Sequence, residues 1–568
     1  MLDFIHIFRC MNQSPNKLLY FFTPILFFFA SCGNDIPDHA GMIDEDAWLL
    51  MTFRPESLIE KSNYEKLMKE GVMSNAPAEA KALITALSLD DPAEAGVDLG
   101  EDVYFFMGGN PDDEKTIKAG VIFALSDVEK FKNTFGTALE LAKKGAGGQI
   151  KVNKSEKEGL TIHSFEGGGR NPALKLLHDD SKVLFAIGAV DGEKLFKEPN
   201  DPDDLPEIFQ NHIGRDFEFG LAVATERMMK AVKQSMSENE QEAMESLSSL
   251  YGTGFSYELS SDEGEILARA FVETGDEVDF ESMMGDGVPD EMVELVPEGS
   301  MAAVSLSLNL KEIAEIMLPK IRELAKTITG QVPAEFPANL DFEIPEQGFT
   351  INDVLTAVPG DVVAALVDLP SGNSEIPGFV VAIGHSGKDS DAYEKVFKGQ
   401  GIMGLKMLGV AAGLTISDED EYFVVKSPGL SSGDSVSGDR SDALSDSAMG
   451  MFVDLKKVSS VIGMFGRENP SMRGDGDGDF EAGKKMLMSA LGNFDLLTFV
   501  VHDHESATIK LVFNDKDEQG FAQATDMILG LIAFQKVAGG NFFGGGRDYE
   551  RGDDGHGDSN QSAEEYKE

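Results

Sequence analysis

The sequence predicts an α+β protein made of two homologous tandem halves, each with mainly antiparallel sheets covered by helices. Two observations predict this fold class. A strand followed by one capping residue and a helix occurs four times, and a similar series of strands and hairpins accompanies it in both halves. We expect the first half to span residues 46–285 and the second to span residues 286–538.

The recurring unit begins with a short apolar strand, expected at residues 48–53, 219–224, 302–308 and 449–453. The residues that follow these strands are Arg54, Thr225, Asn309 and Asp454. The side chains of the last three are of the types that accept a hydrogen bond from the first turn of a helix. Apolar side chains four residues beyond each cap fit the helical period, so we expect one buried stripe per unit: Leu58, Met229, Ile313 and Val458. Lys61 and Ser62 interrupt that stripe in the first copy, which is the least regular.

The remaining elements pair between the halves in the same order. The hairpin predicted at 103–125 matches one at 362–383, and a helix follows each, at 127–135 and 391–397. The strand at 183–187 matches 422–425, and the hairpin at 255–272 matches 496–513. The tetrapeptide GLTI at 159–162 returns unchanged at 413–416. The shared order of elements predicts an internal duplication.

The N-terminal region predicts export. Residues 18–32 read LLYFFTPILFFFASC, an apolar run of signal-peptide length with Arg9 and Lys17 upstream. Residues 29–32 (FASC) resemble a bacterial lipobox, in which the cysteine receives diacylglycerol; an ordinary secretory signal is the alternative. We therefore expect a signal peptide at 1–31, lipidation of Cys32 and a polar tether at 32–45, with Met1 or Met11 as the start. Cys10 would leave with the signal, so no internal disulfide is expected.

The amino-acid composition narrows the classes of partner that the protein is expected to bind. The chain has 48 Lys and Arg against 99 Asp and Glu, a formal net charge of −51. This balance argues against nucleic-acid binding. The expected partners are the membrane, through lipid on Cys32, and a protein or glycan. Gly33 after the lipidated cysteine favours the outer membrane, with the periplasmic or surface side left open. We expect the acidic, Gly-rich tail at 539–568 to be disordered and the polar loop at 428–447 to be mobile.

Two motifs of enzymes occur in unsuitable contexts. Residues 429–433 (GLSSG) satisfy G-x-S-x-G, but a polar loop follows where a nucleophile elbow needs a helix. Gly399, Gly401 and Gly404 form G-x-G-x-x-G, but they follow a helix-like stretch, and no acidic residue ends a second strand as a dinucleotide site requires. No catalytic residues are predicted.

Metal binding is a weaker alternative. Asp475, Asp477 and Asp479 alternate with glycine like the start of a calcium loop, but the later EF-hand positions are occupied by Phe480 and Met486. They form a weak calcium candidate, and otherwise no cofactor is expected. Residues 502–505 (HDHE) are expected at a hairpin tip, where two histidines alone seldom hold a metal.

The layout resembles a family of exported Bacteroidota lipoproteins of unknown function, with a lipobox, a short acidic leader and a repeated strand–cap–helix unit such as the one that opens at residues 48–53. The resemblance implies no catalytic residues. The leading hypothesis is a lipid-anchored, non-enzymatic envelope protein that acts as a scaffold or binding protein. The alternatives are an envelope hydrolase with a site scattered over the fold, and a calcium-dependent adhesion protein.

Overall fold

The computed structural model describes residues 37–538 except 75, 77, 90, 111–115, 146–150, 167–173, 234–235, 237–240, 242–251, 276–278, 330–336, 345–347, 370–376, 398–408, 410–412, 431–432, 446 and 465–486. Within this part the chain forms helices around one large antiparallel sheet, so the prediction of an α+β fold is confirmed.

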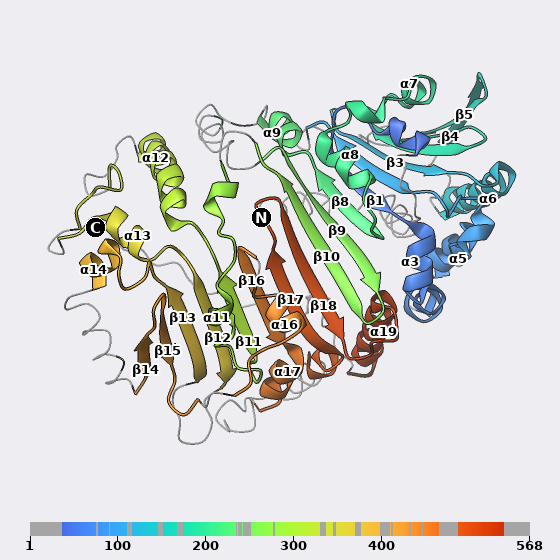
Figure 1. Cartoon of the computed structure of the whole chain (residues 1–568). Coiled ribbons are helices and arrows are strands. Elements are labelled where there is room, and N and C mark those ends of the chain that lie inside the picture. Colours follow the sequence, from blue (N-terminus) through green and yellow to red (C-terminus); the bar gives the residue numbers. More distant parts are fainter. Residues whose placement is uncertain are drawn as a thin grey trace, which may run out of the picture.

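In the described part of the chain the sheet has 18 strands, which follow one another from β4 at one edge to β14 at the other (Figure 1). The pairings give the order β4-β5-β6-β7-β3-β2-β1-β8-β9-β10-β18-β17-β16-β11-β12-β13-β15-β14, and every pair is antiparallel. The strands of the first half are β1 Ala47–Phe53, β2 Val103–Gly108, β3 Lys118–Ala124, β4 Lys151–Lys157, β5 Leu160–Glu166, β6 Leu174–His178, β7 Lys182–Gly188, β8 Phe219–Val223, β9 Gly254–Asp262 and β10 Glu265–Glu273. Those of the second half are β11 Ala302–Leu306, β12 Val362–Asp368, β13 Gly378–Gly384, β14 Thr415–Asp418, β15 Tyr422–Lys426, β16 Met449–Asp454, β17 Phe494–Val501 and β18 Ser506–Phe513.

Helices lie over both faces and around the ends of the strands. The α-helices are α3 Pro55–Lys61, α4 Tyr64–Lys66, α5 Ala78–Ala86, α6 Val128–Gly145, α7 Gly192–Lys197, α8 Glu207–Ile213, α9 Thr225–Lys233, α11 Asp290–Val293, α12 Leu310–Thr329, α13 Ile351–Ala357, α14 Asp391–Phe397, α16 Asp439–Asp442, α17 Leu455–Met464 and α19 Gly520–Ala538. Short 3₁₀ or π segments are η2 Asp38–Met42, η3 Leu67–Met73, η4 Pro92–Ala95, η5 Pro202–Asp204 and η7 Glu281–Met283.

The two halves share one sheet, where the sequence predicted a sheet in each. Strand β10 pairs with β18 over seven residue pairs, from Glu265 opposite Val512 to Phe271 opposite Ser506. An antiparallel edge strand carries unpaired N–H and C=O groups, and each half supplies its last strand to satisfy those of the other. We call this junction the seam.

On both sides of the seam the strands follow in the same order. Moving outward, β10-β9-β8-β1-β2-β3-β7 in the first half corresponds to β18-β17-β16-β11-β12-β13-β15 in the second. The register agrees as well, since Thr52 of β1 lies opposite Gly220 and Ser305 of β11 lies opposite Gly450. Common ancestry of the halves remains a prediction, and this shared order is what supports it.

The repeated tetrapeptide GLTI does not occupy equivalent places. In the first half Leu160 belongs to β5, which is separated from β7 by β6. In the second half Thr415 begins β14, which pairs directly with β15. The spatial counterpart of β14 is therefore β6. The match in sequence reflects the common need for a glycine turn before an apolar strand: Gly159 and Gly413 both have positive φ, at 85° and 73°.

Two segments predicted as loose are packed. The predicted tether at 32–45 extends too far along the chain. Ala40, Met42 and Ile43 are fully buried in the core of the first half. In addition, Asn200 N–H donates to the Gly41 carbonyl. Much of the predicted mobile loop at 428–447 is also ordered in the described part. Val436 and Leu444 join the core of the second half beneath α16. In both segments a few apolar residues among polar neighbours are enough to anchor the backbone.

Two of the three predicted helix N-caps are confirmed. The Asn309 side chain accepts from Glu312 N–H at 3.3 Å, and that of Asp454 accepts from Lys457 N–H at 2.9 Å. Thr225 lies inside the first turn of α9 and its hydroxyl has no partner in the described chain. The predicted interruption of the apolar stripe in the first strand–helix unit is confirmed, because helix α3 ends at Lys61.

Candidate functional site

The strands on either side of the seam present a continuous apolar surface on one face of the sheet. Residues directly opposite in antiparallel strands lie on the same face. One such row runs Tyr257, Ala270, Ala507, Val501 and Met449 across β9, β10, β18, β17 and β16. The next row of that face contains Ala268, Ile509, Phe499 and Met451. We call these nine residues the seam patch.

The seam patch is partly open to solvent. Tyr257 is 54% exposed, Ile509 44% and Met449 36%, and the alanines between them are half-buried. Alanines in the seam strands leave their larger neighbours without side chains to pack against. Scattered exposed apolar residues are ordinary, but a contiguous apolar patch on a soluble surface marks an interaction site.

The opposite face of the same strands is covered in the second half, where Phe452, Leu496 and Val512 of β16, β17 and β18 belong to a buried core, and it is polar at β9 and β10. Glu258, Arg269 and Thr508 lie in one row there, across β9, β10 and β18. Glu258 is buried, and Arg215 Nη1 donates to its Oε1 at 3.1 Å. The seam patch therefore lies on the more open face of these strands, while the opposite face carries buried residues such as Glu258 and Phe452.

A charged network closes the end of β1. Arg54 is 1% exposed, and its Nη1 donates to Asp216 Oδ1 at 2.6 Å while Nη2 donates to the Arg215 carbonyl. Its guanidinium lies over the Phe217 ring, 4.6 Å from the centroid, and its Nε is 3.5 Å from Asp102 Oδ1. Arg54 thus ties β1 to the start of β2 and to the loop before β8.

Burial raises the pKa of Asp102 to about 7, although Arg54 and the Tyr104 hydroxyl pull it down. Arg54 compensates only in part, because its two terminal nitrogens bond Asp216 and Arg215 and only the more distant Nε faces Asp102. The Asp102 carboxyl is consequently about half protonated near pH 7. The enclosure of this pair indicates a structural role.

A second polar cluster lies at the outer part of the second half. Gly387 N–H donates to His385 Nδ1 at 3.1 Å, so the neutral ring carries its proton on Nε2, which lies 3.6 Å from Asp418 Oδ1. The Tyr393 hydroxyl donates to Asp418 Oδ2 at 2.8 Å, and burial raises the pKa of Tyr393 to about 12. The grouping of His385, Asp418 and Tyr393 has the composition of a catalytic cluster. However, the His385 side chain has no exposed surface, so a substrate does not reach it in this structure.

An analogous aromatic cluster lies at the same place in the first half. There α6 supplies Phe131 and Phe135, one helical turn apart, against His178 and His163. In the second half α14 supplies Tyr393 and Phe397 with the same spacing, against His385 and Phe423. Both clusters pack a helix against the end of the sheet. This packing role is enough to explain the presence of their histidines.

Acid is expected to destabilise the fold. Desolvation lowers the pKa of five histidines, that of His163 to about 4; the others are His39, His178, His212 and His385. Below the unfolded value of 6.5 the unfolded chain binds protons that the native chain does not, so stability falls as pH falls. Asp102 opposes this trend, since its raised pKa makes the native chain hold an extra proton between 3.8 and about 7.

Five histidines with lowered pKa values outnumber the one aspartate that opposes them, so we expect the unfolded chain to bind more protons than the native chain in this window. The free energy of unfolding should then fall as the pH is lowered from about 6.5 to about 5. Urea denaturation at a series of pH values measures it. A free energy that is constant or rises over this range would show that the histidines are not held neutral.

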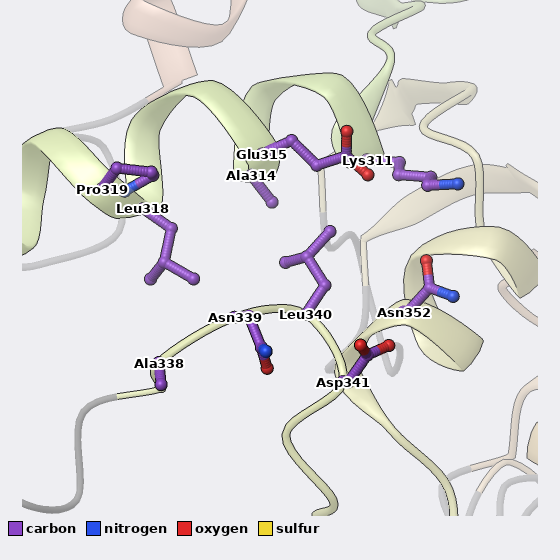
Figure 2. A pocket seen from close by; sticks show the side chains of 10 residues that line it. All are labelled: Lys311, Ala314, Glu315, Leu318, Pro319, Ala338, Asn339, Leu340, Asp341 and Asn352. Carbon is purple, nitrogen blue, oxygen red and sulfur yellow. The ribbon is translucent and has the colours of Figure 1, made fainter.

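A solvent-connected pocket of about 380 Å³ lies between α12 and the segment at 337–341. Figure 2 shows Ala314 and Leu318 of the helix facing Leu340, with the charged Lys311 and Glu315 on the same helix. The Arg322 side chain fixes the segment by donating to the Pro337 carbonyl at 2.6 Å, and Asn352 N–H donates to the Leu340 carbonyl. The lining mixes apolar and polar groups, and none of these contacts selects a ligand.

Most of the site residues predicted from sequence lie outside the described residues. These are Cys32, Asp475, Asp477 and Asp479, together with the serines of the GLSSG motif and the three glycines of G-x-G-x-x-G. Residues 502–505 form the turn between β17 and β18, as expected, where His502 Nε2 lies 2.9 Å from the Thr508 hydroxyl. In the described part of the chain no group of three or more potential metal ligands is present. The calcium hypothesis for Asp475, Asp477 and Asp479 remains a prediction.

Among the helices that the structure describes, none is both long and apolar enough to cross a membrane. No protein-family model matches the chain, and no curated protein matches it. Among solved structures, the chain is similar to crystal form III of TP0453, with 14% identity, 43% of this chain and 83% of that chain covered, and a TM-score of 0.25. Crystal form I of TP0453 gives 12% identity, coverage of 43% and 81%, and a TM-score of 0.24. At this TM-score the similarity carries no argument about function.

The seam patch was not predicted from the sequence, although one signal pointed to it. Alternation in β10 places Ala268 and Ala270 on one face and Arg269 on the other, which predicts a strand with a polar and an apolar side. That the apolar side stays partly open depends on pairing with β18, more than 230 residues away along the chain.

Proposed function

We propose that this protein is a lipid-anchored, non-enzymatic binding protein of the cell envelope, and that the seam patch is its binding surface. The observation that carries the proposal is the exposure of Tyr257, Ile509 and Met449 within uninterrupted apolar rows at the centre of the sheet. The lipobox-like residues 29–32 support the anchor, and the layout supports kinship with the Bacteroidota lipoproteins that it resembles.

The rigid setting of the seam patch favours binding over a purely structural role. Its strands are central in the sheet and hydrogen-bonded on both sides, so the apolar surface is held in shape before a partner arrives. Preorganisation of this kind lowers the entropic cost of binding.

A neutral apolar dye tests the binding surface. Nile red should bind the wild-type chain saturably with a blue-shifted emission, and Ile509→Asp should weaken the affinity by about tenfold or more. Ile321→Asp is the matched control, because Ile321 is 42% exposed, on α12. An equal loss in both variants, or none in Ile509→Asp, would remove the seam patch as the binding surface.

The anchor has its own test. Cells grown with an alkyne fatty acid should label the wild-type protein, and Cys32→Ser should abolish the label. Labelling that persists in the variant would place the lipid elsewhere or show ordinary secretion.

A further inference from the structure

The helices of the first half cover one face of the sheet closely. Phe53 and Val103 lie opposite each other on β1 and β2, and both are at most 5% exposed. Together with Phe123 of β3 they belong to a buried cluster that includes Met68 of η3 and Ile84 of α5. The helices that follow β1 and β2 therefore close off this part of the sheet from solvent.

The equivalent residues of the second half are more exposed. The strand order makes β11, β12 and β13 the counterparts of β1, β2 and β3, so Leu306 opposite Val362 takes the place of Phe53 opposite Val103. Ile383 of β13 lies opposite Val362 on its other side. We call Leu306, Val362 and Ile383 the outer row. All three side chains are partly exposed, whereas their counterparts are buried.

Helix α12 comes directly after β11, as α3 comes directly after β1. It is amphipathic, with Leu310, Met317 and Ile321 along one apolar side. Of the α12 residues whose side chains the structure describes, none is buried, and Ile321 is 42% exposed. Figure 1 shows α12 beyond the ends of β11, β12 and β13 and not across their face. An apolar helix side and an apolar sheet face of the same half are thus both left partly open.

Contacts at two places set the present position of α12. At its start, Asn309 N–H donates to the Met283 carbonyl at 2.9 Å, which fixes the first turn beside the end of β11. Further along, Arg322 Nη1 donates to the Pro337 carbonyl at 2.6 Å. A movement of α12 about its first turn therefore breaks the bond between Arg322 and Pro337 and keeps the one at Asn309.

From these observations we infer that α12 is a strap that closes over the outer row, pivoting at its first turn and burying Ile321 against the sheet. The structure shows the open position, in which Arg322 acts as the latch. Closure gives the second half the helix cover that the first half already has. The burial of Ile321 favours closure and the Arg322 hydrogen bond opposes it, so a single substitution on either side shifts the balance.

The length of α12 fits this movement. The 11-residue step from Leu310 to Ile321 spans about 16 Å of helix. Three neighbouring strands, from β11 to β13, span about 10 Å. A helix that pivots beside β11 therefore reaches across the whole outer row. This inference makes no use of the seam patch, so it stands or falls apart from the proposed function.

A distance measurement between two spin labels tests the strap. One label replaces Lys326, exposed on the polar side of α12, and the other replaces Asp368, exposed at the end of β12 away from Leu306. In the full chain both natural cysteines, Cys10 and Cys32, are changed to serine so that the labels react at two thiols only. We expect two distance populations, of which the shorter, by about 10 Å, is the closed position.

Two substitutions should shift these populations in opposite directions. Ile321→Asp places a charge on the apolar side of α12 and should lower the ratio of closed to open about tenfold. Arg322→Ala removes the bond to Pro337 and should raise that ratio several-fold. Glu315→Gln is the control, because it changes the charge of an exposed residue on the polar side of the helix. It should leave the ratio unchanged within about twofold.

A single distance that is the same in the wild type, Ile321→Asp and Arg322→Ala would overturn the strap, because α12 would then be fixed. Two populations whose ratio does not change in Ile321→Asp would overturn it as well, since the apolar side of α12 would not drive the movement. A single short distance that lengthens in Ile321→Asp would support the strap, with the closed position dominant in solution.

Discussion

Replacing Arg54 with alanine should lower the free energy of unfolding by about 3–5 kcal/mol, because it removes a buried cation with several partners and leaves the buried Asp102 uncompensated. The substitution removes the bond to Asp216, the contact with the Phe217 ring and the cation nearest to the buried Asp102. These contacts join β1, β2 and β8, so we expect their loss to destabilise the whole first half. Urea denaturation followed through Trp48, the only tryptophan, measures it.

Asp102→Asn is the matched control for Arg54→Ala. Burial raises the pKa of Asp102 to about 7, so about half of the carboxyl is protonated near pH 7 and asparagine imitates that form. The control should cost less than about 1.5 kcal/mol. If Arg54→Ala cost less than Asp102→Asn, the guanidinium would not be the centre of this network.

Gly450→Ala should destabilise the protein by about 3 kcal/mol. A Cβ at this position would lie 1.8 Å from the Ala443 carbonyl oxygen and 2.8 Å from Ser305 Oγ. The carbonyl belongs to the backbone that covers β16, so relief requires the segment around α16 to move off the core. Calorimetry of the variant, read as a fall in melting temperature, measures the effect.

The same substitution in α6 should act in the opposite direction. Gly136 lies inside the helix and a Cβ there meets nothing within 4 Å. Gly136→Ala should therefore raise the stability by about 0.5–1 kcal/mol through helix propensity. A similar loss in both variants would mean that the contact with Ala443 is not what excludes a side chain at Gly450.

Much of the fold could be predicted because its signals are local. The four strand–helix units appear where a β-type apolar run meets a capping residue, as at Asn309 and Asp454. The hairpins of both halves appear through alternation and turn residues. By contrast, the number of sheets could not be predicted, because the pairing of β10 with β18 depends on two edges that are distant in sequence.

Two kinds of error have a physical origin. Composition suggested that residues around Ala40 and Leu444 were loose, yet a single buried apolar side chain contributes about 1.5–3 kcal/mol and is enough to dock a polar segment. The GLTI match suggested that β5 and β14 correspond, but identity over four residues reflects a turn requirement and not a place in the sheet.

The candidate site was the least predictable part. The buried pairs of Arg54 with Asp102 and of His385 with Asp418 join residues that are far apart in the chain, and no spacing motif announces them. The seam patch depends on which face the helices leave open, and that is a property of packing.

Hydroxyl-radical footprinting with mass spectrometry tests the central claim, an open apolar patch at the seam, most directly. In the intact protein Met449 and Tyr257 should be oxidised several-fold faster than the fully buried Met42, Met292 and Tyr104. Rates for Met449 and Tyr257 as low as those of the buried residues would contradict the account, because the seam would then be covered by the chain itself.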